Sequence, residues 1–374
     1  MSARERRVLL QNRVDALTRP GGDTRLMLDI ARHLDGSGWR ADISTELEPD
    51  LSDYDLIHLF NISRVHETYC QLAHAKRCGK PVVCSTIYHD YSEFNRRGRC
   101  GARKALARLF RNTERLEYAK NLVRSAVDPA QRPALRLQRS MGYAAQQKRV
   151  LAESDLLMLA ASAELETIRR DFDCAISDYR VVPFGVDAHW SDASPDAFVR
   201  EYGLRGFVLC VGRIEEVKNQ LSLLRALRGA ELSVVLVGAV NPSHRSYYRR
   251  ILKEARGTSA RLIPTLSEDL LKSAYAAASV HALPSWCETF GLVSLEAALA
   301  GANIVTTDRT YATEYLADRV WYCDPGDLDS IRRSVLAAHS SPRRDDLRQY
   351  ITTNLTWDHA IGQVIAAYDT AVVG

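Results

Sequence analysis

The chain has 374 residues, of which 46% are hydrophobic and 26% are charged, and its formal net charge is +4 at pH 7. These are the proportions of an ordinary soluble globular protein, and about 150 residues per domain favours two domains. No stretch approaches the roughly 20 apolar residues that a membrane-spanning helix requires, so we expect none.

The start of the chain and its cysteines indicate a cytoplasmic protein. The first residues, MSARERRVLLQN, pass from a charged start into a strand-like run without the apolar core of a signal peptide. The eight cysteines are scattered and form no CxxC pair. We therefore expect reduced, buried thiols and no disulfide framework.

Short apolar runs alternate with helical patterns along the whole chain, which is typical of parallel sheets wrapped by helices. The runs are rich in β-branched residues and have no polar face, which predicts strands that are covered on both sides. In the first half the expected strands are Arg7–Gln11, Ala41–Thr45, Asp55–Phe60, Pro81–Tyr88, Leu156–Ala160 and Tyr179–Val182. In the second half they are Phe207–Val211, Ser233–Val237, Arg261–Ile263, Val280–Leu283, Asn303–Thr306 and Val320–Cys323.

The positive charge is concentrated in one segment of the first half. Residues 96–150 hold 15 Lys and Arg against three acidic residues, a net charge of +12, while the rest of the chain carries −8. This segment has no strand pattern, and its apolar residues have helical spacing: Leu106, Leu109, Phe110, Leu116 and Val123. We interpret it as a basic helical insertion whose charge needs a functional explanation.

A second interruption separates the two halves. Residues 185–206 are polar, include Pro195 and end in the turn Glu201-Tyr-Gly-Leu-Arg-Gly, which indicates an interdomain linker. Sheets of similar size on either side predict an α/β protein with two doubly wound domains. In such folds ligands bind at the carboxyl ends of the strands, so we expect the site in the cleft between the domains.

The strongest motif runs from Pro284 to Gly301 and follows a predicted strand. The amides after Glu288 are expected at a helix N-terminus, where Gly291 allows close approach of a phosphate or a hydroxyl-rich ligand. Glu288 and Glu296 are eight residues apart, which predicts one side of a helix, where two carboxylates can accept hydrogen bonds from an extended sugar ligand. The alternative is a solvated helix face whose acids happen to align.

A second motif ends another predicted strand with Gly212 and Arg213, and Lys218 follows five residues later. Arginine supplies a fork of donors and lysine a point charge, a combination suited to a pyrophosphate. The alternative is a pair of surface cations beside Glu215 and Glu216.

Two weaker signals lie in the first half. Gly21 and Gly22 form a turn between a strand and a helix, which would bring backbone amides close to a ligand, although most such pairs are only turns. His89 and Asp90 follow another strand, where a histidine could bond a sugar hydroxyl or serve a structural role. Asp171-Phe-Asp173 lies apart from these motifs, and we interpret it as solvated and not as a metal site.

The ordered motifs of the second half resemble those of glycosyltransferase family 4, a family of retaining enzymes with the GT-B fold. Over about 120 residues the expected order is kept by Val181-Val-Pro-Phe-Gly-Val-Asp187, Gly212-Arg213, Lys218-Asn219, Leu283-Pro-Ser and the E-x7-E of Glu288 and Glu296. Thr313-Glu314 resembles a later acidic position of the family. The first half is similar only through Gly21-Gly22 and His89-Asp90.

The resemblance implies two Rossmann-like domains that face a central cleft. Residues 1–190 would form the acceptor-side domain with the basic insertion at about 96–150, and residues 200–355 would form the nucleotide-sugar-binding domain. Residues 356–374, which begin beside Trp357, would form a helix that crosses back to the first domain.

The resemblance also implies roles for individual residues. Arg213 and Lys218 would neutralise the diphosphate as the leaving group gains charge, which is the work that a divalent metal does elsewhere. Glu288 would bind hydroxyls of the donor sugar, and Glu296 would hold the ribose. Amides that would assist Glu288 belong to Phe290, Gly291 and Leu292.

In the first half, Gly21 and Gly22 would approach the phosphates and His89 would touch the transferred sugar. Two departures from the family pattern leave the identity of the donor open. Gly301-Ala-Asn303 replaces Gly-x-Pro, and Thr310-Tyr-Ala replaces a glycine-rich turn before Glu314.

We therefore expect a metal-independent, retaining hexosyltransferase that uses a UDP- or GDP-sugar, needs no cofactor and acts on a glycan or lipid-linked acceptor in polysaccharide biosynthesis. The alternatives are a soluble disaccharide-forming transferase and a non-catalytic protein that binds nucleotide sugars or nucleic acid. The basic insertion could rest on the anionic inner face of the cell membrane, at about 1 kcal/mol per cation. Aromatic residues are sparse in this insertion, which disfavours nucleic acid as its partner. The remaining alternative is a solvated helical face.

Removal of divalent metal provides a first test. Because Arg213 and Lys218 are expected to neutralise the diphosphate, EDTA should leave the rate of sugar transfer almost unchanged. A strict divalent requirement in the same assay would contradict this interpretation.

Overall fold

The computed structural model describes residues 4–101, 118–119, 121–123, 125–126 and 128–373. The chain divides into two compact domains. The first domain comprises the described residues of 1–89, 110–185 and 357–374, and the second comprises those of 90–109 and 186–356. The predicted domain limits at residues 190, 200 and 355 stay predictions.

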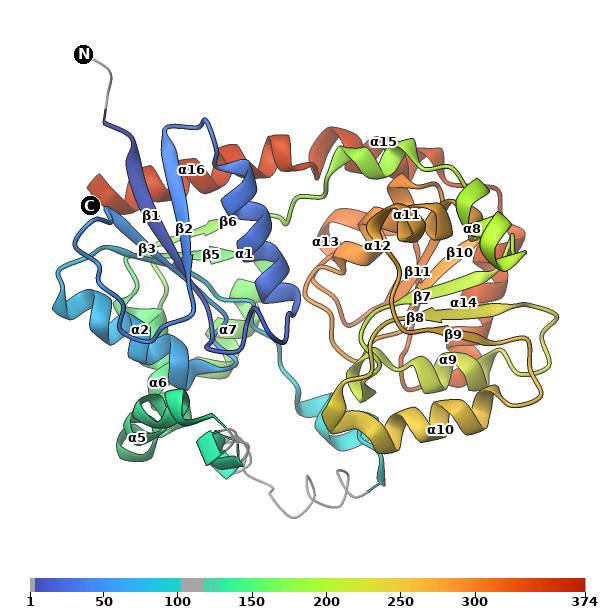
Figure 1. Ribbon diagram of the computed structural model, residues 1–374, viewed down its shortest axis with the longest axis horizontal. Helices are drawn as coiled ribbons and strands as arrows, with labels where there is room; N and C mark the ends of the chain where they lie inside the picture. The colour runs from blue at the N-terminus through green and yellow to red at the C-terminus, as the bar shows by residue number, and fades with distance from the viewer. Residues whose placement is uncertain (1–3, 102–117, 120, 124, 127, 374) are drawn as a thin grey trace. The chain divides into compact units, whose positions relative to one another are not determined.

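The first domain is built on a six-stranded parallel sheet with the order β2-β1-β3-β4-β5-β6 (Figure 1). Its strands are β1 (Arg6–Gln11), β2 (Trp39–Ser44), β3 (Leu56–Phe60), β4 (Val82–Ser85), β5 (Leu156–Leu159) and β6 (Tyr179–Val181). Its helices are α1 (Gly22–His33), α2 (Val65–Arg77), α5 (Arg132–Met141), α6 (Tyr143–Glu153), α7 (Ser162–Phe172) and α16 (Trp357–Val373). Apolar side chains of α1 and α16 pack with one set of strand residues, and those of α2, α6 and α7 pack with the alternate set, so the sheet is covered on both faces.

The second domain is built on another six-stranded parallel sheet, with the order β12-β11-β10-β7-β8-β9. Its strands are β7 (Val208–Val211), β8 (Val234–Val237), β9 (Arg261–Ile263), β10 (Val280–Leu283), β11 (Asn303–Thr307) and β12 (Trp321–Cys323). Its helices are α8 (Asp196–Tyr202), α9 (Gln220–Ala226), α10 (Arg245–Ala255), α11 (Glu268–Ala277), α12 (Leu292–Leu299), α13 (Thr313–Leu316), α14 (Leu328–Ser340) and α15 (Asp345–Asn354). The direction of strand addition reverses between β7 and β10, which is where doubly wound sheets bind their ligands.

The twelve strands found among the described residues lie where the sequence predicts them, and the doubly wound α/β fold class is confirmed. The central strands β3, β4, β7, β8 and β10 are buried throughout, as expected of parallel strands. The prediction that every strand is covered on both sides is wrong for β2, β6, β9 and β12. These strands lie at sheet edges and keep exposed or half-buried residues.

Residues 186–206 are not a solvated linker, because they pack into the second domain. Trp190 and Phe198 are almost fully buried there, and α8 lies against α11. In the basic segment 96–150 the described residues include α5 and α6 and no strand. Of the five apolar residues that predicted helical spacing there, only Val123 lies among the described residues, and it is exposed. Within the described ranges, no helix combines the length and the apolar character that crossing a membrane requires.

A buried hydrogen-bond chain links the C-terminal helix to the first sheet. The hydroxyl of Tyr368 on α16 lies 2.7 Å from Nδ1 of His58, and Nε2 of His58 lies 2.8 Å from Oγ of Ser85. Complete burial lowers the pKa of His58 to about 3, so the ring is neutral and offers one donor and one acceptor. The chain Tyr368–His58–Ser85 therefore satisfies both ring nitrogens inside the core.

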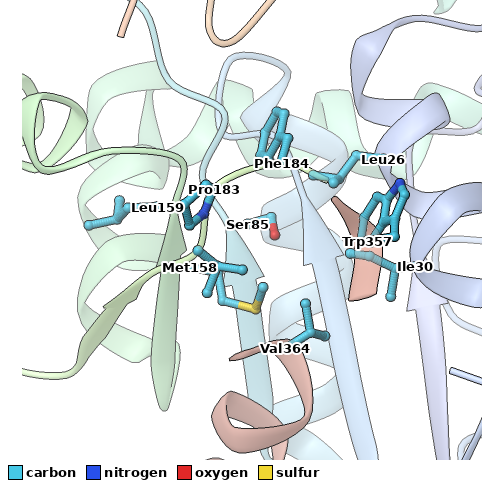
Figure 2. A pocket seen from close by; sticks show the side chains of 10 residues that line it. Leu26, Ile30, Ser85, Met158, Leu159, Pro183, Phe184, Trp357 and Val364 are labelled. Carbon is cyan, nitrogen blue, oxygen red and sulfur yellow. The ribbon is translucent and has the colours of Figure 1, made fainter. Parts of the chain in front are cut away.

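Ser85 also faces a small apolar cavity in the first domain (Figure 2). The cavity is lined by Leu26, Ile30, Ser85, Met158, Leu159, Val182, Pro183, Phe184, Trp357 and Val364. Its volume of about 10 Å³ leaves room for at most about one water-sized sphere. It is a packing defect of the core and is too small for a sugar or a nucleotide.

The substitution Tyr368→Phe tests the buried chain. It removes the partner of a ring nitrogen that no water can reach, so we expect the free energy of unfolding to fall by about 1–3 kcal/mol. Tyr179→Phe, at an exposed ring, is the matched control in urea titrations. Equal stability of the two variants would show that the Tyr368 hydroxyl contributes nothing.

Candidate functional site

The candidate site lies at the carboxyl ends of β7 and β10, which pair with each other in the second sheet. The turn after β7 leads to η4 (Glu216–Lys218), a single 3₁₀ turn that ends in Lys218, and the loop after β10 carries Glu288. Nζ of Lys218 lies 2.6 Å from Oε2 of Glu288. Two residues singled out separately in the sequence are thus brought together as an ion pair.

The Lys218–Glu288 pair is partly shielded from water. The side chains are 21% and 13% exposed, respectively. Burial alone would lower the pKa of Lys218, but the carboxylates of Glu288 and Glu215 together outweigh burial and the pKa is raised. The ammonium therefore stays charged at neutral pH, and the charge is held at the end of the sheet where an anionic ligand would bind.

The backbone around the pair is shaped by glycine and by a left-handed residue. A Cβ on Gly238, at the end of β8, would lie 2.0 Å from the carbonyl oxygen of Gly212, so only glycine fits there. Asn219 adopts φ = 59° and donates from Nδ2 to the carbonyl of Pro325 at 2.8 Å. These contacts fix the turn that carries Lys218.

The loop of Glu288 differs from its predicted geometry. Helix α12 begins at Leu292, not near Glu288, because Gly291 has a left-handed φ of 71° that interrupts the helical backbone. Glu288 instead donates its amide to the carbonyl of Arg309 at 3.2 Å and forms a bridge with Thr310. The prediction that Glu288 and Glu296 share one side of a helix is therefore wrong.

Glu296 lies on α12 and is only 7% exposed. Its Oε2 accepts a hydrogen bond from the hydroxyl of Tyr275 at 3.1 Å. Phe290, which belongs to the same motif, is buried with its ring 5.3 Å from that of Tyr315. The alternative of a solvated acidic helix face is thereby excluded for Glu296, because a carboxylate that is buried and held by a tyrosine is not solvated.

Arg213 is the more exposed cation of the site, with 45% of its side chain accessible. Its Nη2 lies 3.2 Å from Oε1 of Glu215, whose other oxygen accepts from Nδ2 of Asn241 at 3.0 Å. Arg213 is therefore oriented by a neighbouring carboxylate, while its exposure leaves it accessible to a ligand.

In the first domain, Gly21 precedes α1 and Gly22 is its first residue. The amide of Gly21 donates to Oγ1 of Thr24 at 3.2 Å, and a Cβ on Gly21 would lie 2.6 Å from Asp23. A Cβ on Gly22 would meet nothing within 4 Å. The predicted approach of both glycines to a phosphate stays a prediction.

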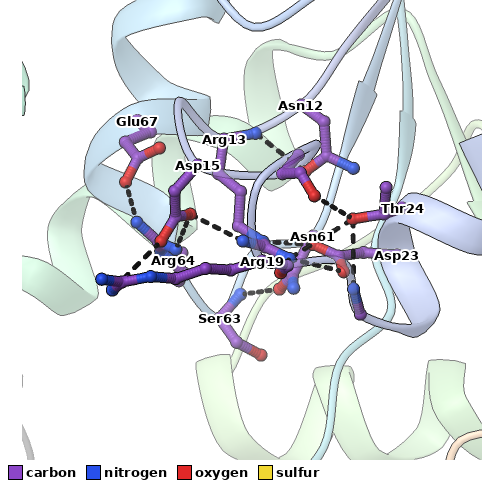
Figure 3. A network of polar contacts seen from close by, with 12 residues as sticks. Asn12, Arg13, Asp15, Arg19, Asp23, Thr24, Asn61, Ser63, Arg64 and Glu67 are labelled. Carbon is purple, nitrogen blue, oxygen red and sulfur yellow. Dashed lines mark hydrogen bonds and ion pairs between the residues drawn. The ribbon is translucent and has the colours of Figure 1, made fainter. Parts of the chain in front are cut away.

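A polar network surrounds this turn, and the sequence analysis did not predict it (Figure 3). Arg13 binds Asp23 at 2.8 Å and Asp15 at 2.6 Å, and Arg64 binds Asp15 at 2.5 Å and also binds Glu67. Burial alone would raise the pKa of Asp23, but the guanidinium of Arg13 lowers it. The alternating charges tie the turn after β1 to the start of α2.

His89 is half-buried in the loop after β4, and the neighbouring backbone explains its position. Ile87 has an unusual positive φ of 45°, which a β-branched residue adopts only when its surroundings impose it. The residues on either side of Ile87 are held by Glu164, which is fully buried, with its pKa raised by burial, and accepts hydrogen bonds from the amide of Tyr88 and the hydroxyl of Thr86. The catalytic role of His89 stays a prediction.

Asp171 and Asp173 belong neither to the Lys218–Glu288 site nor to the polar network around the turn before α1. Asp171 accepts from the hydroxyl of Tyr88 at 3.0 Å, and Asp173 ends α7 with a left-handed φ of 47°. Over the part of the chain that the structure describes, no cluster of three His, Cys, Asp or Glu side chains is placed to bind a metal ion.

Comparison with known proteins identifies the second domain. Residues 198–354 match the family model described as "Glycosyl transferases group 1". The matched residues, 198–354, are similar to this family. The family resemblance predicted from its motifs is thereby confirmed.

Curated relatives agree with this family. The D-inositol 3-phosphate glycosyltransferase of Salinispora arenicola is 28% identical over 263 residues, which are 60% of this chain and 57% of the relative. The O-antigen chain mannosyltransferase B of Escherichia coli is 27% identical over 177 residues, which are 44% of this chain and 46% of the relative. The chain spans about half the length of the curated relatives it matches.

Solved structures with the same fold cover nearly the whole chain. The sucrose-phosphate synthase of Thermosynechococcus elongatus has a TM-score of 0.74 at 14% identity, with 98% of this chain and 99% of that chain covered. HepE of Anabaena in complex with UDP-glucose has a TM-score of 0.70 at 15% identity, with 97% and 99% covered. These likenesses concern the fold alone and confirm the GT-B class.

Substitution of Lys218 or Glu288 tests the candidate site. Lys218→Ala or Glu288→Ala should reduce sugar transfer by a factor on the order of 100 or more, because Lys218 is expected to stabilise the charge on the leaving diphosphate and Glu288 is expected to hold the donor sugar. The fold should persist, as judged by circular dichroism. Lys253→Ala, at an exposed position of α10, is the control and should keep full turnover; full turnover in both site variants would remove the assignment.

Proposed function

We propose that the chain is a glycosyltransferase that moves a hexose from a UDP- or GDP-sugar to a glycan or lipid-linked acceptor with retention of anomeric configuration. The observation that carries this proposal is the Lys218–Glu288 ion pair at the point where the second sheet reverses its strand order. The pair places a permanent cation and a carboxylate side by side, as a diphosphate and an adjoining sugar would require.

In the proposed mechanism, the two members of the pair act on different parts of the donor. Lys218, whose charge is secured by a raised pKa, would donate to the diphosphate, and the accessible guanidinium of Arg213 would assist it. Both would stabilise the negative charge that the leaving diphosphate gains, so no metal ion is required in this proposal. Glu288 would accept hydrogen bonds from the sugar hydroxyls and hold the anomeric carbon in place.

Glu296 would recognise the ribose of the donor. The hydrogen bond from Tyr275 fixes one of its oxygens, and an ionised carboxylate can accept several bonds at once. Helix α12 begins at Leu292, and Phe290 and Gly291 come just before it. Their amides would contribute donors to the same ligand, which favours a nucleotide sugar over a neutral glycan at this end of the sheet.

Relatives and neighbours support the ligand classes. A HepE structure was solved with UDP-glucose, which supports a UDP-sugar among the donors. The E. coli relative is named as an O-antigen chain mannosyltransferase, which supports a glycan acceptor and polysaccharide biosynthesis. Several relatives are named D-inositol 3-phosphate glycosyltransferases, and they favour a small phosphorylated acceptor as the second candidate.

The proposed location is the cytoplasm, with peripheral binding to the inner face of the cell membrane through the basic segment 96–150. Within that segment, α5 presents Arg132, Arg136 and Arg139 on a helix whose buried residues are Ala134 and Gln138. A helix with this distribution of charge is attracted to anionic lipids.

A thermal-shift screen tests the donor site. UDP, GDP, ADP and their sugar conjugates are added to the metal-free protein, and one base should stabilise it, by about 2.7 kcal/mol at a ligand concentration of 100 Kd. The shift should disappear in Arg213→Ala and persist in the control Arg256→Ala, whose side chain is exposed beyond α10. Absence of any shift in the wild-type protein would contradict the proposed function and favour a non-catalytic protein.

A further inference from the structure

A short segment without a motif of its own contacts four loops around the candidate site. Residues 90–101, here termed the docking segment, come directly after His89 in the chain but belong to the second domain. Their contacts lie on the loops that follow β7, β10, β11 and β12, all at the carboxyl edge of the second sheet. The four loops include those that carry Lys218 and Glu288.

The first contact is apolar and lies on the loop of Glu288. Phe94 forms a buried cluster with Trp286 and Cys287, the two residues that precede Glu288, and Val217 packs against it. Gly98 closes this contact: a Cβ on it would lie 2.5 Å from the Phe94 ring and 2.8 Å from that of Trp286. Such distances are too short for any side chain, so the close approach requires glycine.

The second contact is polar and lies on the turn of Lys218. Glu216, two residues before Lys218, is 2% exposed, and its Oε1 accepts from the amide of Cys100 at 3.2 Å. Its other oxygen lies 3.8 Å from the guanidinium of Arg99. A buried carboxylate requires such partners, because an uncompensated charge in the interior is strongly destabilising.

The third contact is an ion pair on the loop after β11. Glu93 accepts from Nε of Arg309 at 2.9 Å. The carbonyl of Arg309 in turn accepts the amide of Glu288 at 3.2 Å. The charge pair therefore holds the backbone to which Glu288 is bonded.

The loop after β12 completes the set. The guanidinium of Arg97 lies over the ring of Trp286 at 5.7 Å, and a Cβ on Gly326 would lie 2.3 Å from Nη2 of Arg97. The loops of Lys218 and Glu288 are also joined directly, because the amide of Trp286 donates to the carbonyl of Val217 at 2.8 Å. The docking segment thus rests on a pair of loops that are already connected to each other.

We propose that the docking segment is a positioning element of the donor site, with Glu93, Phe94 and Gly98 as its positioning residues. None of the three is assigned a contact with substrate. They act through Trp286 and Arg309, while Arg99 and Cys100 of the same segment contact Glu216. These contacts fix the two loops that must hold Lys218 and Glu288 at bonding distance. This inference rests on the proposed function, since the ligand whose binding it governs is the nucleotide sugar.

The test compares two glycine substitutions in the full chain. In Gly98→Ala the new methyl group must displace Phe94 or Trp286, so donor affinity should fall about tenfold or more by calorimetric titration with the nucleotide sugar found in the thermal-shift screen. In the control Gly362→Ala on α16, the new methyl group meets nothing within 4 Å. That control should leave donor affinity unchanged, and the KM for the acceptor should be unchanged in both variants.

A second pair of variants keeps the test informative if Gly98→Ala folds poorly. Glu93→Gln removes the charge that holds Arg309 and should also weaken donor binding, whereas Glu153→Gln, which loses only the exposed pair with Arg149, should not. Hydrogen exchange gives a readout that needs no donor: the amides of Trp286 and Glu288 should exchange faster in Gly98→Ala and Glu93→Gln than in the controls.

The outcomes separate the two proposals. If the wild-type protein binds a nucleotide sugar and both docking-segment variants bind it equally well, with unchanged exchange at Trp286, the positioning role is overturned and the proposed function stands. If the wild-type protein binds no nucleotide sugar, both proposals fail. Weaker binding that appears equally in the control variants would also overturn the positioning role.

Discussion

The pairing of β7 with β10 is the constraint on which the candidate site depends. These strands are neighbours in the second sheet although some 70 residues separate them in the chain, and each ends at the same edge because parallel strands share a direction. The turn after one carries Lys218 and the loop after the other carries Glu288, so the sheet order alone brings the two charges together. Local contacts then shape the two loops. Gly238 allows the end of β8 to approach Gly212 at the end of β7, and the left-handed Gly291 means that α12 begins only at Leu292, after Glu288.

The two domains stabilise their strand ends in different ways. In the second domain Arg213 and Lys218 each form an ion pair with a carboxylate and keep 45% and 21% of their side chains exposed. In the first domain Arg13 and Arg64 are held among Asp15, Asp23 and Glu67, and each cation contacts two carboxylates. Such a network compensates its own charges, so it orders the turn before α1 more readily than it attracts an anion. This contrast is the physical reason to assign the diphosphate to Lys218 and Arg213.

The sequence predicted the sheets well because each central strand is a continuous apolar run that water cannot reach, and such runs can be recognised without knowledge of their neighbours. Predictions from the sequence were wrong where contacts between distant residues determine the local structure. Residues 186–206 are polar overall, yet Trp190 and Phe198 anchor them in the second domain. The eight-residue spacing of Glu288 and Glu296 predicted a shared helix side, but a left-handed glycine lies between them. The buried chain from Tyr368 to His58 joins residues 310 positions apart, and no local pattern predicts it.

The most direct test of the account compares binding of the nucleoside diphosphate with binding of its sugar conjugate in Lys218→Met and Glu288→Gln. If Lys218 holds the diphosphate and Glu288 holds the sugar, Lys218→Met should weaken both ligands, and Glu288→Gln should weaken only the conjugate. Calorimetric titration without metal measures all four affinities. Equal losses for the two ligands in Glu288→Gln, or unchanged affinities in Lys218→Met, would contradict the division of roles on which the proposed function rests.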